Sequence, residues 1–276
     1  MMLARAFQRA GNVILGMAFL PSRDPAEPFP GYLIPAAYQS FAETERLSQV
    51  FIPSRQGRIL PLPLLAQSAA GLGHVILDFD PDGALRREFL GIEHGDALFP
   101  PLALSIAKRY LGLSPKEITF VPGTEIRAGA SDPIRIPLDA RTTTLINYYG
   151  PGNMIPSYSI VDILSGKVNK AVFRDKAVLI GGAAIGIADL WPTPFSPAFR
   201  GVEKQATLVE NILSRDFLQV PDWDFWYTLG CMFGFALFLA LVITRLSLYA
   251  SLPLLLICLS LPVAISYLAF VRHSLF

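Results

Sequence analysis

The residues with the clearest chemical potential lie in a loop that follows an apolar run at 176–182. Gly182 ends this run, Asp189 and Thr193 lie in the loop, and Arg200 closes it. Open α/β sheets bind ligands beyond the carboxyl ends of their strands, so these four residues are the candidate ligand-binding residues. A buried aspartate can equally cap the backbone of its own long loop. We favour that structural role for Asp189 and keep ligand binding as the alternative.

A second acidic motif resembles the start of a calcium-binding loop. Its residues are Asp78, Asp80 and Asp82, followed by Gly83. Such a loop needs a bidentate acid at its twelfth position, where this chain has Phe89, and Arg86 stands where a ligand is needed. We therefore interpret Asp80, Asp82 and Gly83 as the structural turn of a β-hairpin and expect no metal site there.

Residue type and spacing disfavour several further kinds of chemistry. The glycines within 181–186 resemble a phosphate-binding loop, but Ile187 and Ala188 replace the lysine and the hydroxyl residue that a P-loop requires. The histidines are His74, His94 and His273, and they have neither ligand-like spacing nor cysteine partners for zinc. We interpret the first two as solvated or hydrogen-bonded structural residues. The sequence therefore predicts no cofactor and no enzymatic activity.

The composition indicates a polar domain joined to an apolar C-terminal tail. Only 16% of the 276 residues are charged, and residues 225–276 contain just two charges, Arg245 and Arg272. A net charge of +1 without a basic run excludes the electrostatic surface of a nucleic-acid-binding protein. The segments 225–244 and 246–271 are each long enough to cross a bilayer as a helix. They predict a transmembrane helical hairpin in contact with membrane lipid.

The flanking charges predict the orientation of this hairpin. Arg245 lies in the tight turn between the two spans, and Asp222 and Asp224 precede the first span. Positive charge in a short loop favours the cytoplasmic side, so residues 1–224 are expected outside the cytoplasm. Both cysteines fall within the spans, and neither reports on the redox compartment.

The domain at 1–224 is predicted to be α/β, with a largely parallel sheet and one β-hairpin. The clearest strand is 176–181, whose apolar residues on both faces indicate a central parallel position. Strands are also predicted at 75–79 and 84–92, which form the hairpin, and at 118–121 and 143–148. Helices are predicted at 36–48, 62–70, 102–110, 159–165 and 201–214.

The N-terminal residues allow two interpretations. Two arginines followed by the apolar residues 11–20 resemble a signal peptide, but no small-residue cleavage site follows. The alternative is a short helix at 3–10, a stop at Gly11, and a buried strand at 13–19. We favour the helix and strand, because they agree with the family resemblance that follows.

Three blocks of residues occur in a specific order. The first runs from Ala70-Gly71-Leu72-Gly73-His74 into the Asp80-Pro81-Asp82-Gly83 turn, and the second is Phe99-Pro100-Pro101-Leu102. The third begins at Asn147-Tyr148-Tyr149-Gly150-Pro151 and continues through 176–181, Asp189 and Gly201 to Leu213. Together, over roughly residues 7–224, these blocks resemble the second type of CHASE domain (cyclase/histidine-kinase-associated sensing extracellular).

The resemblance implies an extracytoplasmic sensor domain of a bacterial receptor in the inner membrane, with a cyclase or kinase effector in the cytoplasm. It implies one membrane helix before the domain and about three after it, whereas this chain has two apolar segments and no effector. Such receptors usually act as dimers, so a homodimer is expected, with a small-molecule or protein stimulus. Lys204 and Gln205 stand where the family often has an apolar residue and a histidine. Any ligand role of that histidine is therefore expected to be absent here.

The short connection between the domain and its first span indicates how a signal would pass. Residues 216–224 leave few flexible positions, and Trp223 and Trp226 are expected at the level of the lipid headgroups. Gly230 and Gly234 offer a small-residue face for helix contact, although glycine is also common in membrane helices. We assign these four residues to signal transmission. The alternatives are a membrane-anchored extracytoplasmic hydrolase and an assembly scaffold.

Overall fold

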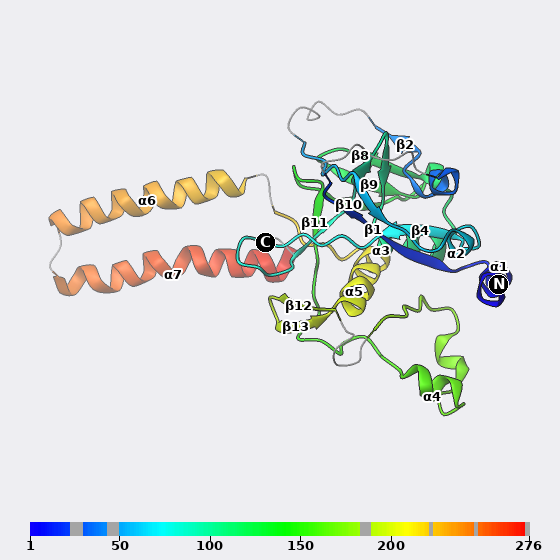
Figure 1. The fold of residues 1–276 in the computed structure, drawn as a ribbon. Helices are drawn as coiled ribbons and strands as arrows, with labels where there is room; N and C mark the ends of the chain where they lie inside the picture. The colour runs from blue at the N-terminus through cyan, green and yellow to red at the C-terminus, as the bar shows by residue number, and fades with distance from the viewer. Residues whose placement is uncertain (23–29, 43–49, 183–188, 221–222, 246–247, 274–276) are drawn as a thin grey trace. The chain divides into compact units, whose positions relative to one another are not determined.

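The computed structural model describes residues 1–22, 30–42, 50–182, 189–220, 223–245 and 248–273. The chain divides into two compact units, Met1–Phe217 and Leu218–Phe276, and each is described by itself (Figure 1). The first unit is a mixed α/β domain built from small sheets and short helices. The second unit contains two long apolar helices.

The first unit begins with a helix that leads directly into a strand. Helix α1 (Met2–Ala10) ends at Gly11, whose φ of 63° lies in the left-handed region and whose N–H donates to the carbonyl of Phe7. Strand β1 (Ile14–Leu20) follows. This order confirms the predicted helix, glycine stop and strand.

Strand β1 is the central strand of a sheet with the order β3-β1-β4. It pairs in parallel with β4 (Gly71–His74) and antiparallel with β3 (Gly57–Ile59). Helix α3 (Leu102–Tyr110) packs against this sheet. Its close approach requires Gly73, because an added Cβ there would lie 2.5 Å from Cα of Leu102.

A second sheet, with the order β10-β9-β8-β2, contributes to the main core. Its strands are β2 (Ser40–Phe41), β8 (Ile118–Val121), β9 (Glu125–Ala128) and β10 (Ile134–Pro137). Helix α5 (Gly201–Ser214) packs on α3, and its residues Leu208 and Ile212 are fully buried in the main hydrophobic cluster with side chains of this sheet. The core therefore joins α3 and α5 to the second sheet.

The remaining elements of the first unit are short. Two-stranded sheets pair β5 (Arg87–Phe89) with β11 (Thr143–Leu145), β6 (Ile92–His94) with β7 (Ala97–Phe99), and β12 (Leu190–Thr193) with β13 (Ser196–Arg200). The short helices are α2 (Pro63–Ala66) and α4 (Ile160–Leu164), with 3-10 turns at η1 (Gly31–Ala36), η3 (Pro115–Glu117) and η4 (Lys170–Phe173). Helix α4 lies on a long excursion of the chain between β11 and β12 (Figure 1).

The sheets are mixed, so the predicted largely parallel sheet is wrong. Among the described strands, only β1–β4 and β2–β8 pair in parallel, and the other ladders are antiparallel. The prediction depended on the segment 176–181, which pairs with no strand in the described part of the chain. Its residues alternate between half-buried and exposed, so only one of its faces meets the rest of the domain.

The predicted β-hairpin at 75–92 is present mainly as its turn. Gly83 has a φ of 81°, and its N–H donates to the carbonyl of Asp80 at 2.8 Å, as the turn prediction requires. The predicted strand before the turn is reduced to a single bridge between Asp78 and Arg87. Strand β5 pairs instead with β11, which lies far along the sequence.

The helices predicted at 102–110, 159–165 and 201–214 are confirmed as α3, α4 and α5. Helix α2 covers only part of the prediction at 62–70, because Gly71 begins β4 instead of ending a helix. The helix predicted at 36–48 is wrong over its described part, since β2 is extended there to pair with β8. Residues 43–49 of that prediction lie outside the described residues.

The second unit consists of helices α6 (Asp224–Arg245) and α7 (Leu248–His273). They contact each other, and the Tyr227 hydroxyl of α6 donates to the carbonyl of Pro262 in α7 at 3.1 Å. The segment Leu252–Val271 is long and apolar enough to cross a membrane, with a mean hydropathy of 2.5, whereas the described apolar part of α6, Phe225–Ala240, is shorter. The second predicted span is therefore supported as a candidate membrane helix, and the span at 225–244 stays a prediction.

Candidate functional site

Most of the predicted ligand-binding residues lie where the β12–β13 hairpin meets the start of α5. Leu190 pairs with Arg200 at the open end of the hairpin, and Asp189 directly precedes β12. The backbone carbonyl of Asp189 accepts a hydrogen bond from the N–H of Gly201, the first residue of α5, at 2.8 Å. Its side chain is exposed. Asp189 and Arg200 are therefore neighbours at the N-terminal end of α5.

Gly182 and Thr193 take different positions relative to this pair. Gly181, directly before Gly182, lies against α5, since an added Cβ would be 2.6 Å from Cβ of Val202. Residues 183–188, which carry the rest of the glycine-rich loop, lie outside the described residues. Thr193 lies at the turn of the hairpin, where its Oγ1 accepts a backbone N–H at 3.2 Å. Gly182 is thus close to the start of α5, and Thr193 is at the opposite end of the hairpin.

Arginine side chains occupy the aspartate turn. Asp82 accepts two hydrogen bonds from Arg86, at 2.7 and 2.8 Å, and Asp80 accepts a third from the same guanidinium at 2.8 Å. Arg87 contacts Asp80 at 3.4 Å and donates to Asp139 at 2.8 Å. The hydrogen bonds from Arg86 are the main reason why the pKa of Asp82 falls to about 2. Among the described residues, no group of three potential metal-ligating side chains is found.

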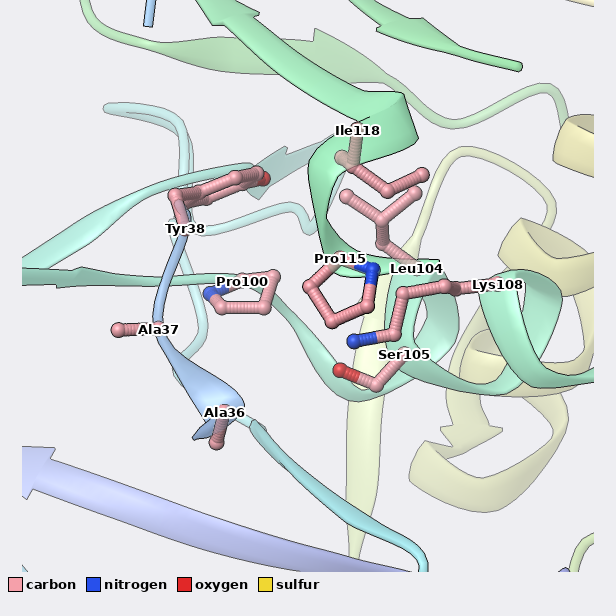
Figure 2. A pocket seen from close by; sticks show the side chains of 9 residues that line it. All are labelled: Ala36, Ala37, Tyr38, Pro100, Leu104, Ser105, Lys108, Pro115 and Ile118. Carbon is pink, nitrogen blue, oxygen red and sulfur yellow. The ribbon is translucent and has the colours of Figure 1, made fainter. Parts of the chain in front are cut away.

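A shallow hollow lies beside α3 (Figure 2). It is lined by Ala36, Ala37, Tyr38, Pro100, Leu104, Ser105, Lys108, Pro115 and Ile118. Its volume is about 280 Å³ with the open mouth included, and its enclosed part has room for about one water molecule. The side chain of Lys108 extends from α3 toward Ser105 (Figure 2), and burial lowers the pKa of its ammonium group. This hollow can admit an ion or a water molecule and is too small to enclose a metabolite.

A group of charged and polar side chains is enclosed in the interior of the domain. We call His74, Glu88, Lys204 and Gln205 the Glu88–Lys204 cluster. His74 ends β4, Glu88 is the middle residue of β5, and the other two residues lie in the first turns of α5. Each side chain is at most 6% exposed. The cluster therefore joins two strands from different sheets to one helix.

Glu88 and Lys204 form a buried ion pair. Nζ of Lys204 donates to Oε2 of Glu88, and Nε2 of Gln205 donates to Oε1 of Glu88 at 3.3 Å. Nδ1 of His74 accepts a long hydrogen bond from the N–H of Ile76 at 3.4 Å. Removing two charges from water is costly, and their attraction offsets the cost only when the remaining hydrogen-bonding groups are also satisfied.

Hydrogen bonding around this ion pair is incomplete. Four buried side-chain atoms in the described part of the chain lack a partner: Nε2 of His74, Oδ2 of Asp78, Oγ1 of Thr144 and Oε1 of Gln205. Two of them belong to the cluster, and Thr144 lies opposite Glu88 in the β5–β11 ladder. An unpaired buried polar atom costs about 1–3 kcal/mol. The observed arrangement of the cluster is therefore less favourable than a fully paired one.

The two members of the cluster whose pKa is perturbed respond in opposite directions. Burial, reinforced by the positive charge of Lys204, lowers the pKa of His74 to about 3. Burial raises the pKa of Glu88, and the charge of Lys204 acts against this shift. His74 is therefore neutral at pH 7, with Nδ1 as the acceptor and the proton on the unpaired Nε2.

Sequence reasoning missed this cluster. The apolar residues Val202 and Leu213 of the predicted helix are only partly buried, whereas the polar residues Lys204 and Gln205 are buried. The available signal is the departure of residues 204 and 205 from the family pattern. Both histidines are hydrogen-bonded, as one of the predicted alternatives has it: His74 accepts the N–H of Ile76, and Nδ1 of His94 contacts the carbonyl of Arg55 at 2.8 Å. Their structural role stays a prediction.

Comparison with known proteins identifies the family. The family model of the CHASE2 domain matches residues 1–245 of the sequence. The chain belongs to the CHASE2 domain family. The match includes the whole first unit and α6, and it confirms the resemblance inferred from the residue blocks. Comparison with curated proteins and with solved structures gave no match.

CHASE2 domains form an extracellular sensory family, which makes sensing the function to consider for this site. Family membership and the apolar helix α7 together indicate a membrane-anchored protein. Within the described part of this CHASE2 domain, two of the four buried side-chain atoms without a partner belong to the Glu88–Lys204 cluster, which includes residues of the first turns of α5.

The predicted transmission residues of the CHASE2 chain lie at the beginning of α6. The rings of Trp223 and Tyr227 meet edge to face with centroids 5.6 Å apart, and Trp226 is 69% exposed. Gly230 and Gly234 are exposed, and an added Cβ on either residue would meet no atom within 4 Å. Their side of α6 is therefore open within the described part of the second unit.

Proposed function

We propose that this chain is the sensing module of a bacterial transmembrane receptor. Residues 1–224 lie outside the cytoplasm, and α6 and α7 cross the inner membrane in contact with its lipid. A conformational change in the domain passes through these helices to a cytoplasmic cyclase or kinase. The receptor acts as a homodimer, and its stimulus is a small molecule or a protein. Membership of the CHASE2 family supports the sensory role.

The observation that carries the proposal is the position of the Glu88–Lys204 cluster on α5. Lys204 lies in the first turn of this helix, and nine residues, 215–223, separate the end of the helix from α6. A displacement of α5 therefore reaches the first membrane helix through a connection that is too short to absorb much of it.

The incomplete hydrogen bonding of the cluster supports two alternative arrangements of α5. Lys204 binds one oxygen of Glu88, while Nε2 of His74 and Oε1 of Gln205 lack partners. In this proposal a small rotation or shift of α5 exchanges these contacts for others, and the unpaired atoms are the groups available to form them. A ligand that binds one arrangement more tightly then shifts the population toward it by the difference in affinity.

The predicted ligand-binding residues adjoin the same helix. Asp189 and Arg200 flank its first residue, and Gly182 follows the glycine that packs against Val202. We assign ligand contact to these residues and to Thr193 in the same hairpin. Binding there acts on the N-terminal turn of α5, next to Lys204, so ligand occupancy and the arrangement of the cluster are coupled.

A reporter chimera tests the transmission step. Residues 1–276 are followed by a further helix and a nucleotide cyclase, and cyclase output is measured in cells. Glu88→Leu with Lys204→Met replaces the ion pair by apolar side chains and is expected to change basal output by about 5-fold or more, a typical coupling between two states. The change follows because the variant no longer distinguishes the two arrangements of α5.

The matched control for this chimera is Asp162→Asn with Lys167→Met. It removes an exposed ion pair of 3.2 Å at α4 and should leave the output unchanged. Expression and thermal stability of both variants are measured alongside the output. Equal output from the two variants at equal expression contradicts transmission through α5.

Selective labelling tests the membrane arrangement separately. Lys116→Cys, at an exposed position of the first unit, and Ser247→Cys, between α6 and α7, are introduced into a Cys231→Ala/Cys258→Ala chain. A thiol reagent that cannot cross lipid should label position 116 in intact spheroplasts and position 247 only after lysis. The reverse order of labelling would overturn the extracytoplasmic placement of residues 1–224.

A further inference from the structure

The segment 176–182 has exposed apolar side chains and backbone groups without hydrogen-bond partners. Val178 and Ile180 are 53% and 83% exposed. Within the described part of the chain, no hydrogen bond involves the backbone N–H or carbonyl groups of this segment. An exposed apolar strand with a free edge pairs with other strands unless something covers it. The segment is therefore available to pair with another strand.

Neighbouring contacts hold the segment in place. The hydroxyl of Tyr110 donates to the carbonyl of Asp175 at 3.1 Å, and Ala177 packs against the main hydrophobic cluster. Gly181 lies against Val202, where an added Cβ would be only 2.6 Å from the valine Cβ. Ala177 and Leu179 are half-buried and the residues between them are exposed, which is the alternation of a strand. The segment thus has the side-chain alternation of a strand, and its backbone groups have no partner among the described residues.

We propose that segment 176–182 pairs antiparallel with the same segment of a second copy of the chain, centred on Leu179. The proposal specifies the surface of the homodimer proposed above. An antiparallel pair of identical strands has two-fold symmetry, so the contact is self-complementary and closes at two copies. Each copy supplies the backbone donors and acceptors that the other lacks.

The side chains select this register. Centring on Leu179 places Val178 opposite Ile180, and β-branched side chains pack well against cross-strand neighbours on a pleated surface. Lys176, the only charged residue of the segment, falls opposite Gly182, so no like charges meet. A shift of one residue would place exposed side chains opposite half-buried ones, because opposed residues share a face of the ladder. A shift of two residues would bring Ile180 opposite either Lys176 or itself and separate it from Val178.

Helix α4 provides a useful contrast on the same excursion of the chain. Leu164 is 82% exposed, almost the same fraction as Ile180. Its backbone has the helical conformation of α4, so it offers no strand edge. Exposure of an apolar side chain is therefore shared by both sites, and only the 176–182 segment combines it with an unpaired backbone.

Disulfide cross-linking of the full-length chain tests the register. Val178→Cys and Ile180→Cys are made singly in the Cys231→Ala/Cys258→Ala chain, with tags of different size, and are co-expressed in membranes. Opposed residues of an antiparallel pair have Cα atoms about 4.5–5.5 Å apart, which a disulfide spans. In a pair of two copies of the same variant, the Cα atoms of the two cysteines would lie roughly 8 Å apart across the ladder, which is too far for a disulfide.

The expected product is therefore a mixed disulfide between the two variants, at least ~10-fold more abundant than either like-with-like product. Co-expression of Val178→Cys with Leu164→Cys is the control and should give no such product. Absence of the mixed disulfide, or equal amounts of all combinations, overturns the proposed pairing. The topology labelling described above is independent of this result, so failure of the pairing and failure of the receptor function are distinguishable.

A pair of glutamate variants tests the same surface without cross-linking. Ile180→Glu should raise the dimer dissociation constant in detergent by at least ~10-fold, because it places a charge opposite the apolar Val178 of the other copy. Leu164→Glu, at a matched exposed position, should change it less than about 2-fold. Both residues are exposed, so the fold of the monomer is unaffected by either change. Equal effects of the two variants contradict the proposal.

Discussion

Two adjacent residues of strand β5 belong to two groups of charged side chains that differ in burial. Arg87 meets the aspartates of the turn at the surface, in a group that also contains Arg86, and we call this group the Asp80–Arg86 cluster: Asp80, Asp82, Arg86, Arg87 and Asp139. Glu88, the next residue, points to the opposite face and pairs with Lys204 in the interior. The side chain of Arg87 is 24% exposed, and that of Glu88 is fully buried.

This difference in burial determines how strongly each charged group is expected to affect the stability of the domain. In the surface cluster Asp82 and Asp139 accept several hydrogen bonds and Asp80 accepts one, and water screens any contact that is lost. In the buried cluster water cannot replace a lost partner, so every unpaired atom retains its full cost. The two ion clusters are therefore expected to contribute very differently to stability and pH dependence.

The largest effect is expected from separating the buried pair. Lys204→Met leaves the carboxylate of Glu88 buried without its cation, which should lower the free energy of unfolding by about 3–5 kcal/mol. Glu88→Leu together with Lys204→Met removes both charges and should restore stability to within about 1 kcal/mol of the wild type. Urea unfolding of the three proteins, followed by tryptophan fluorescence, measures these differences.

The double variant is the decisive control in that experiment. A loss that persists in the double variant would show that the lysine contributes mainly through packing of its aliphatic part. A loss that disappears would show that the unpaired charge is responsible. The contrast between the two clusters requires that the loss disappears in the double variant, because the burial of its charge is what distinguishes Glu88 from the aspartates of the turn.

A second effect concerns acid stability and originates at His74. The folded protein holds the pKa of this histidine at about 3, below its ordinary value of 6.5. The unfolded chain therefore binds the proton first. The stabilisation is fully present above pH 6.5 and is lost as the pH falls toward 3, at about 1.4 kcal/mol per pH unit.

Comparing wild type with His74→Gln over pH 7 to 4 isolates this contribution. The variant should lose less stability on acidification, and the difference between the two curves should grow below pH 6.5. Burial raises the pKa of Glu88, which contributes with the opposite sign and is common to both proteins. Parallel curves for the two proteins would contradict a neutral, buried His74.

The predictability of the fold from sequence differs between its helices and its sheets. The ends of α1 and α3 follow from local signals, such as Gly11 and the prolines before Leu102, which act within one helical turn. Strand pairing depends on distant partners, and Glu88 of β5 pairs with Thr144 of β11. The run at 176–181 has the strongest strand signal, yet an apolar run reports burial and cannot specify which strand lies beside it.

The candidate site divides in the same way. The Asp80–Gly83 turn is predictable because its residue types require one local backbone conformation. The Glu88–Lys204 cluster is not, because a lysine on an amphipathic helix is assigned to solvent by its type. Its burial follows from a partner 116 residues away in the chain. Only the tertiary structure brings these two charges together.

The smallest effect is expected at the surface cluster, where Asp82→Asn removes one carboxylate from Arg86. Asp82 is exposed, and Arg86 retains its 2.8 Å contact with Asp80, so the change in unfolding free energy should be well below that of Lys204→Met. The hydrogen bonds from Arg86 lower the pKa of Asp82 to about 2, so its contribution is present above about pH 4 and is lost as the pH falls toward 2. Because 1 M salt screens exposed charges, it should abolish most of the difference between wild type and Asp82→Asn and leave the effect of Lys204→Met intact. Urea unfolding at about 0.05 and 1 M sodium chloride measures the free energy of unfolding of both variants. If the stability lost in Asp82→Asn is the same at the two salt concentrations, the two clusters do not differ in the way that their burial implies.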